Sequence, residues 1–223
     1  TGTDANVGAT DFTIEFWVKG SVADNTASGC GTANDAWING NVVIDRDVYG
    51  GGDRGDYGIS LFAGRVAFGA SVGSLGATVC GTTNVLDGQW HHVAVTRRAS
   101  DGRMQLWVDG VLDGGNSSSP AAGNLSYRVG RSTPWPADPT LVFGAEKHDA
   151  GPAYPSFNGY FDAFRVWNGA LSQSRILDVY DRVLAGSTAN LVAYYRFEEG
   201  SGTTVSDSSA AGSPVGQLIA GIP

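Results

Sequence analysis

Several short segments of the chain alternate between hydrophobic and polar residues, which is the pattern of strands that turn one face toward a core. The clearest example is 12–18, in which Phe12, Ile14, Phe16 and Val18 fall on one face and predict a half-buried strand. Further strands are predicted at 41–46, 57–62, 65–70, 90–97, 103–108, 125–130, 141–144, 159–167, 191–197 and 215–219.

Glycine-containing turns separate these segments. Ala63-Gly64 and Asp109-Gly110 are two-residue connections of the kind that joins antiparallel strands. The segment 172–185 instead has apolar residues at helical spacing, with Ser172 placed to cap its start and Gly186 to end it. Many short strands and one late helix predict an antiparallel all-β sandwich. We expect residues 1–223 to form one such domain.

The composition narrows the range of partners. The net charge of −8 and the pI of about 4.7 disfavour DNA and RNA, whose phosphates require a basic surface. An acidic surface is instead compatible with calcium and with neutral or cationic ligands. No segment approaches the roughly 20 consecutive apolar residues of a membrane span, so we expect no membrane insertion.

The chain has two cysteines, Cys30 and Cys80, and each lies in a stretch rich in Gly and Thr. Similar loop settings predict a disulfide between two loops on one rim of the sandwich. Two free thiols in a cytosolic protein are the alternative. A disulfide favours an oxidising compartment, so the sequence predicts a secreted or cell-surface protein.

An acidic turn follows Gly144, where Glu146 and Asp149 stand three residues apart beside Lys147 and His148. Such a turn offers carboxylate and backbone oxygens, the ligands that calcium prefers. Converging carboxylates repel each other unless a cation neutralises them. The turn therefore predicts a calcium site, with a solvated acidic loop as the alternative.

Several longer phrases, taken in their order along the chain, are similar to a known family. They are FTIEFWVK at 12–19, DGQWHHVAVT at 87–96, LWVDG at 106–110, GYFDAFRVWNGA at 159–170 and LVAYYRFEEGSGTTVSD at 191–207. Together they resemble laminin-G-like and pentraxin-like domains of the concanavalin A-like lectin/glucanase superfamily. The resemblance implies a jelly-roll β-sandwich that is secreted, non-catalytic and often calcium-binding, and that recognises carbohydrate or a protein partner.

The resemblance also implies a fuller calcium site. Gly144-Ala145-Glu146 is similar to the start of the Gly-x-Glu-x-Asp turn of pentraxins, although Asp149 falls one residue later than in that pattern. A distant Asp/Asn loop supplies the remaining ligands in that family. The implied ligands are Glu146, Asp149, the Lys147 carbonyl, and Asp53 or Asp56, with Asp45 and Asp47 as alternatives.

Aromatic residues in loops form a second candidate group, because their faces stack on the C–H faces of sugar rings. The group comprises Trp37, Tyr49, Trp135, Tyr154 and Phe157, and we predict ligand contacts for the first four. The alternative for Trp135, which stands between two prolines, is a loop anchor folded back on the core.

An enzymatic function is not favoured by the sequence. His91 and His92 are neighbours in a strand, so they point to opposite faces and cannot bind one ion together. The paired-carboxylate strand of laminarinase-like relatives, which serves retaining hydrolysis, is also missing from the sequence. We therefore expect a calcium-dependent carbohydrate-binding or adhesion module, monomeric within a larger multidomain protein. A structural or protein–protein module with calcium only stabilising its loops is the alternative, and a glycan-cleaving enzyme is a distant one.

Overall fold

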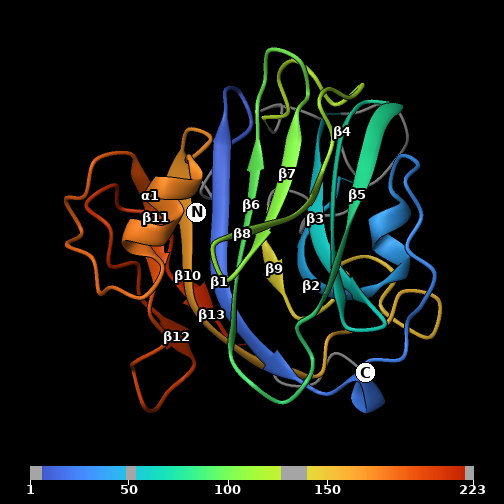
Figure 1. Cartoon of the computed structure of the whole chain (residues 1–223). Coiled ribbons are helices and arrows are strands. Elements are labelled where there is room, and N and C mark those ends of the chain that lie inside the picture. The colour runs from blue at the N-terminus through green and yellow to red at the C-terminus, as the bar shows by residue number, and fades with distance from the viewer. Residues whose placement is uncertain (1–6, 49–53, 127–139, 219–223) are drawn as a thin grey trace.

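Two antiparallel sheets face each other in the computed structural model, which describes residues 7–48, 54–126 and 140–218 (Figure 1). One sheet has six strands in the order β11-β10-β1-β6-β7-β8, and the other has five in the order β5-β4-β3-β2-β9. The strands are β1 (Phe12–Gly20), β2 (Asn41–Arg46), β3 (Arg54–Phe62), β4 (Arg65–Val72), β5 (Leu75–Asn84), β6 (His91–Arg97), β7 (Met104–Val108), β8 (Val111–Gly115), β9 (Val142–Phe143), β10 (Gly159–Asn168) and β11 (Leu191–Tyr195). The predicted all-β sandwich is confirmed.

The core lies between the two sheets and is built from alternate residues of each strand. In β1, Phe12, Ile14, Phe16 and Val18 are all at most 1% exposed, as their spacing predicts. The two predicted hairpin turns are also present: Ala63-Gly64 and Asp109-Gly110 have positive φ at both residues. That geometry matches the right-handed twist of the strands that each turn joins.

The prediction that β1 is only half buried is wrong, because its other face is covered too. Glu15, on the outer face of β1, is 0% exposed. The helix α1 (Gln173–Val179) covers this face through two small apolar clusters. The first contains Trp167, Val179, Leu191 and Tyr194, and the second contains Ala94, Trp107 and Ile176. Alternation along one strand cannot reveal a cover that comes from a distant segment.

The helix begins as predicted and ends before the predicted Gly186. Ser172 caps its first turn by accepting the N–H of Arg175. At the end of the helix, side chains of the sheet donate to two of the free carbonyls. Arg165 donates to Val179 O (2.8 Å), and Trp17 Nε1 donates to Tyr180 O (3.1 Å).

A short 3-10 helix, η2 (Ala36–Asn39), covers the outer side of the five-stranded sheet. Its Trp37 is 1% exposed, and the indole lies over Gly58 and Gly69, which are cross-strand partners in β3 and β4. A Cβ at either glycine would stand within 2.0 Å of the indole. The predicted ligand contact of Trp37 is therefore wrong, since its ring fills a slot in the sheet and cannot stack on a sugar.

The predicted disulfide between Cys30 and Cys80 is confirmed. It joins the loop before η2 to the strand β5 rather than two loops, because 75–84 forms a strand that the sequence pattern did not predict. At this edge β8 lies beside β5, where Asp113 of β8 accepts hydrogen bonds from the backbone and hydroxyl groups of Thr82 and Thr83.

The C-terminal part of the chain completes the opposite edge. β11 pairs with β10 at the end of the six-stranded sheet, and β12 (Thr204–Val205) pairs with β13 (Gly216–Gln217) in a small separate sheet. Of the predicted strand at 125–130, Leu125 and Ser126 are not in a strand and the rest lies outside the described residues.

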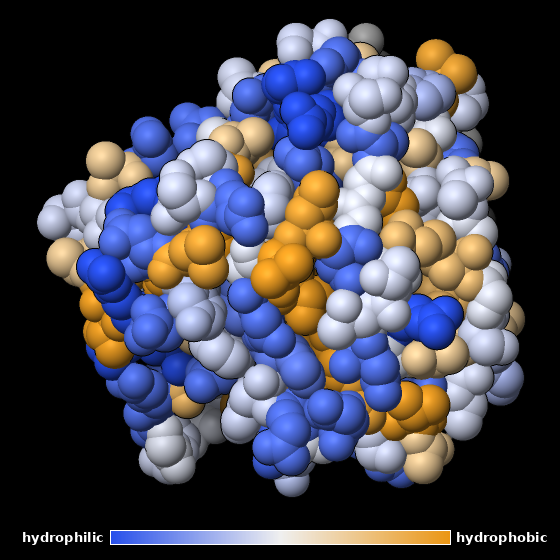
Figure 2. Space-filling view, viewed as in Figure 1, coloured by the Kyte–Doolittle hydropathy of each residue, from blue (hydrophilic) through white to orange (hydrophobic). Residues whose placement is uncertain are grey.

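The surface drawn in Figure 2 is a mixture of polar and apolar side chains, with the apolar ones gathered mainly in an oblique band across its middle. Exposed apolar residues include Val111 and Leu112 of β8 and Leu177 of α1. No helix in the described ranges is long and apolar enough to span a bilayer.

Candidate functional site

Two segments that end in polar residues meet at the edge of the five-stranded sheet. β2 is followed by Asp47, and β9, which pairs with β2, is followed by a turn through Gly144 to Asp149. Gly144 has a φ of +84°, a conformation that glycine adopts without strain, and its N–H donates to Val43 O (2.8 Å). The turn therefore folds back over the end of β2 and brings Glu146 toward Asp47.

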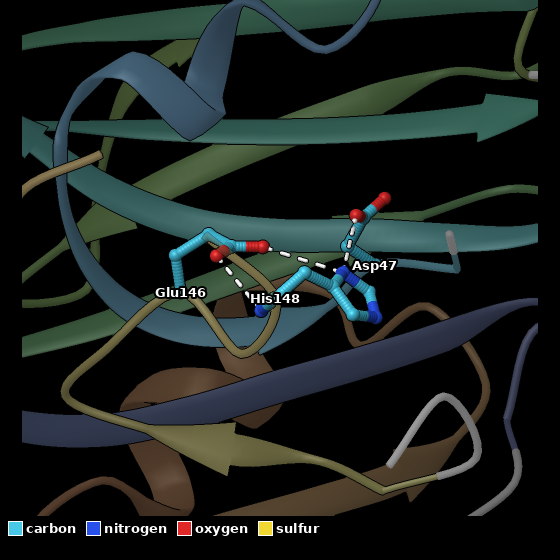
Figure 3. A group of neighbouring side chains, drawn as sticks. All are labelled: Asp47, Glu146 and His148. Carbon is cyan, nitrogen blue, oxygen red and sulfur yellow. Dashed lines mark hydrogen bonds and ion pairs between the residues drawn. The ribbon is translucent and has the colours of Figure 1, made fainter. Parts of the chain in front are cut away.

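Three side chains converge there, as Figure 3 shows. Asp47, Glu146 and His148 each present a ligand atom, and these atoms all lie within 4.8 Å of one another. The Nδ1 atom of His148 is 3.1 Å from Asp47 Oδ2 and 3.3 Å from Glu146 Oε1. The side chains of Glu146 and His148 are each 1% exposed, whereas that of Asp47 is 20% exposed. The group therefore has one side open to solvent, at Asp47.

Backbone hydrogen bonds fix this arrangement. Glu146 Oε2 accepts the N–H of His148 (2.8 Å) and the N–H of Asp149. The fully buried Asp45 accepts the N–H of Asp47 (2.5 Å) and the N–H of Lys147 (2.8 Å), and so ties the end of β2 to the turn. The ligand atoms are held in place before any ion binds, which limits the ordering that binding requires.

The surroundings of the three residues hold further buried carboxyl groups. Burial raises the pKa of Asp45 to about 6. Burial, together with the negative charges of Asp47 and Asp35, raises the pKa of Asp56 to about 8. Asp56 accepts the N–H of Val48 (2.9 Å) and lies 3.3 Å from the Ser71 hydroxyl. Carboxyl groups are thus crowded at this edge, and a bound cation would favour their ionised forms.

The raised pKa of Asp56 predicts a specific pH dependence of stability. Between its unfolded pKa near 3.8 and its folded pKa of about 8, the folded state holds a proton that the unfolded chain has released. The contribution of Asp56 to stability is therefore fully present below that window and is lost as the pH rises through it. In chelator we expect this one carboxyl group to lower the free energy of unfolding by on the order of 2–3 kcal/mol from pH 5 to pH 7.

Urea unfolding at pH 5, 6 and 7 measures this effect, and the variant Asp56→Asn isolates it. Asp45, whose folded pKa is about 6, adds a loss of stability in the same direction between pH 5 and pH 6. Burial lowers the pKa of His91, but Asp109 and Asp87 raise it by more, and this adds a further loss in that direction. The difference in slope between the wild type and Asp56→Asn removes both contributions. Equal slopes for the two proteins would contradict the assignment to Asp56.

The donor set fits a divalent cation. The carboxylate oxygens of Asp47 and Glu146 are ligands suited to calcium, which takes about six to eight oxygens. The imidazole nitrogen of His148 is a ligand that zinc and other transition metals accept more readily. Of the described residues, these three would hold the ion, and Asp45 would orient the turn around it.

Only some of the predicted metal ligands lie in the converging group. Glu146 is in the converging group, together with Asp47, which the sequence offered only as an alternative. The side chain of Asp149 is not in it, although its N–H supports Glu146. Asp56 is absent from it too, and Lys147 contributes its N–H to Asp45 while its Nζ donates to Thr140 O. Asp53 lies outside the described residues.

His148 is the site residue that sequence reasoning missed. It stands two residues after Glu146 in the turn, so both side chains can reach the same side of the loop. The signal was present in the Glu146-x-His148 spacing. The adjacent carboxylates and backbone oxygens predicted an all-oxygen calcium site, to which an imidazole nitrogen does not belong.

The predicted sugar-binding aromatics are scattered. Tyr154 is half buried in a tight turn, in which its backbone exchanges two hydrogen bonds with Gly151. Phe157 packs against the core cluster and lies over Gly159. Tyr49 and Trp135 lie outside the described residues. Trp37 is buried, as described above, so no aromatic platform of these residues is seen in the described part.

The neighbouring histidines point to opposite faces, as predicted. His91 lies between Asp109 (2.8 Å) and Asp87 (3.2 Å). His92 is 1% exposed, and its Nε2 is 3.2 Å from Glu15 Oε2. The two rings therefore belong to different environments and do not form one ion site.

Comparisons of the sequence with known families and proteins agree with this architecture. The family model of the Concanavalin A-like lectin/glucanases superfamily, of laminin G type, matches residues 1–177. Human Pentraxin-4 is 32% identical over 129 residues, which is 57% of this chain and 23% of that protein. The mouse Sushi, von Willebrand factor type A, EGF and pentraxin domain-containing protein 1 is 30% identical over 103 residues, 44% of this chain and 2% of that protein. The chain thus spans less than a quarter of each relative.

Solved structures show the same fold. A candidate carbohydrate-binding protein from Bacteroides ovatus aligns with a TM-score of 0.58 at 16% identity, covering 96% of this chain and 55% of that one. A heptameric SAP-like pentraxin from Limulus polyphemus aligns with a TM-score of 0.50 at 15% identity, covering 97% of this chain and 87% of that one. Because the family model matches residues 1–177 and the fold agrees with it, the chain belongs to the concanavalin A-like lectin/glucanases superfamily, as a laminin-G/pentraxin-like domain.

Proposed function

We propose that this domain is a calcium-dependent carbohydrate-binding module of an exported protein. The observation that carries the proposal is the convergence of Asp47, Glu146 and His148 at one edge of the sandwich. The ion would order the loops at this edge and leave coordination positions on its exposed side, at Asp47, for hydroxyl groups of a ligand.

Other findings support parts of the proposal. The family and the structural likeness to a candidate carbohydrate-binding protein favour a binding module. The disulfide between Cys30 and Cys80 favours an oxidising compartment and hence export. The acidic net charge of −8 favours neutral ligands over anionic ones. We further propose that residues 1–223 act as one monomeric unit within a longer protein.

Calcium added to the chelator-treated domain is expected to raise the melting temperature. An ion present at about 100 times its Kd stabilises the folded state by about 2.7 kcal/mol, a shift of several degrees for a domain of this size. Glu146→Gln and the more exposed Asp47→Asn are each expected to abolish most of that shift. Differential scanning calorimetry with and without calcium measures it.

A matched control variant is Glu199→Gln, because Glu199 is exposed and lies outside the group. It is expected to keep the full calcium shift. Zinc is titrated in parallel, since the His148 nitrogen makes it the second candidate ion. A wild-type domain whose melting temperature responds to neither ion would contradict the metal-dependent part of the proposal.

A glycan array in calcium buffer then tests the ligand class. Binding of glycans that disappears with chelator supports the proposal in full. A calcium-stabilised domain that binds no glycan supports the alternative, a structural or protein–protein module in which the ion only stabilises loops. Release of products from polysaccharides would instead show a glycan-cleaving enzyme.

A further inference from the structure

A pocket of about 420 Å³ opens on the outer side of the six-stranded sheet, beside the end of α1. Its volume falls within the range of roughly 300–1,000 Å³ that is typical of small-molecule sites. Its walls come from β1, β10 and β11 and from the segments before β6, after α1 and after β11. It shares no residue with the group of Asp47, Glu146 and His148. The pocket is therefore a separate candidate site.

Aromatic side chains form much of the wall. Trp17 and Tyr180 are stacked, with ring centroids 5.9 Å apart and an interplanar angle of 24°. Trp90 is 43% exposed although it is a large apolar residue, and its ring centroid is 6.4 Å from that of Tyr160. Exposed aromatic faces beside polar groups suit sugar rings, which present C–H faces and hydroxyl edges.

A buried arginine holds the floor of the pocket in place. Arg165 is 3% exposed and donates to Glu15 Oε1 (3.1 Å), to Val179 O (2.8 Å) and to Arg182 O (2.5 Å). Its guanidinium also lies 4.7 Å from the ring centroid of Tyr194. The strands and the segment after α1 are thus connected through one side chain, so ligand binding requires little further ordering.

Protein carboxylates already pair with the arginines of the pocket. Arg196 lies 2.6 Å from Glu198, and Arg182 lies 3.1 Å from Asp178. Such pairs present donors and acceptors side by side, an arrangement suited to hydroxyl groups, which both donate and accept. An anionic ligand would have to compete with the protein's own carboxylates for these guanidinium groups.

Two further acidic residues lie in the wall, Asp162 and Asp181. Neither has an ion pair with a Lys or Arg among the described residues. Their charges disfavour phosphate, sulfate and carboxylate groups in the pocket. The charge balance therefore favours an uncharged, hydroxyl-rich ligand.

We infer that this pocket binds a neutral oligosaccharide, with one sugar ring stacked on Trp90 and hydroxyl groups on the pair of Arg196 and Glu198. The inference rests on the proposed carbohydrate-binding function and adds a second sugar site to the one at the ion, on the outer face of the six-stranded sheet. Binding here does not involve Asp47, Glu146 or His148. It therefore does not require the divalent ion to contact the sugar.

The test begins with a glycan array and continues with fluorescence titration of the best neutral oligosaccharide on the array. Intrinsic tryptophan emission is the readout, because Trp17 and Trp90 both line the pocket. Trp90→Ala is expected to weaken the Kd about tenfold, and Glu198→Gln about fivefold, since roughly 1.4 kcal/mol corresponds to a factor of ten. Both side chains are exposed, so neither substitution should prevent folding.

Matched controls separate this site from the metal site. Glu199→Gln makes the same change at the next residue, outside the pocket, and is expected to keep the wild-type Kd. A Kd that survives Trp90→Ala and Glu198→Gln but is lost in Asp47→Asn overturns the pocket assignment and leaves carbohydrate binding intact. Tighter binding of sulfated or sialylated glycans overturns the neutral specificity. An array without any glycan bound overturns the carbohydrate function together with this site.

Discussion

Replacing Arg165 by methionine is expected to lower the free energy of unfolding by about 3–5 kcal/mol, because it removes the arginine partner of a buried carboxylate. Its partner Glu15 is 0% exposed. Burial acts to raise the pKa of Glu15, but His92 and Arg165 together lower it, so the carboxyl is ionised in the folded state. The substitution also removes the donor that holds the Val179 carbonyl at the end of α1. Urea unfolding followed by circular dichroism measures the loss.

The matched control is Arg98→Met, which breaks an exposed pair with Asp101 and is expected to leave the urea midpoint nearly unchanged. The double variant of Glu15→Gln and Arg165→Met should regain part of the loss, because no charge is then left buried. A midpoint for Arg165→Met as high as that of Arg98→Met would contradict the role assigned to the buried pair.

Removing the disulfide between Cys30 and Cys80 is expected to lower the free energy of unfolding by about 4 kcal/mol. The two residues are 50 positions apart, and closing a loop of that length restricts the unfolded chain by about this amount in the chain-entropy model. The bond also fixes the loop that leads into η2 to β5, so Trp37 is expected to become less firmly held over the sheet.

The measurement compares urea midpoints of the oxidised protein, the reduced protein and the double variant of Cys30→Ser and Cys80→Ser. The reduced protein and the double variant should have similar midpoints, both well below that of the oxidised protein. The double variant should not respond to reductant. An oxidised protein whose midpoint stays the same after reduction would argue against a stabilising role of the bond.

The candidate metal site illustrates how far sequence patterns reach. Glu146 was predicted from the acidic turn alone, because a carboxylate in a tight turn is recognisable locally. Its partner Asp47 is nearly a hundred residues earlier in the sequence, and only the pairing of β2 with β9 brings the two together. The sequence could offer Asp47 only as one of several acidic residues.

Local sequence patterns also cannot predict how distant segments pack, and Trp37 and the pocket beside α1 are two examples. Nothing near Trp37 in the sequence distinguishes an exposed loop aromatic from one that fills the slot over Gly58 and Gly69. The pocket likewise takes its lining from segments between residues 17 and 198, so no local motif marks it.

The sequence by itself determined the β-sandwich, the course of β1, β2, β6 and β10, the hairpin turns and the start of α1. These follow from alternation, turn chemistry and composition, which act between near neighbours along the chain. Only the tertiary structure decided which strands are covered on both faces, where α1 ends and which carboxylates converge. Those features depend on contacts between distant segments, whose geometry is fixed by sheet order and not by any local pattern of residues.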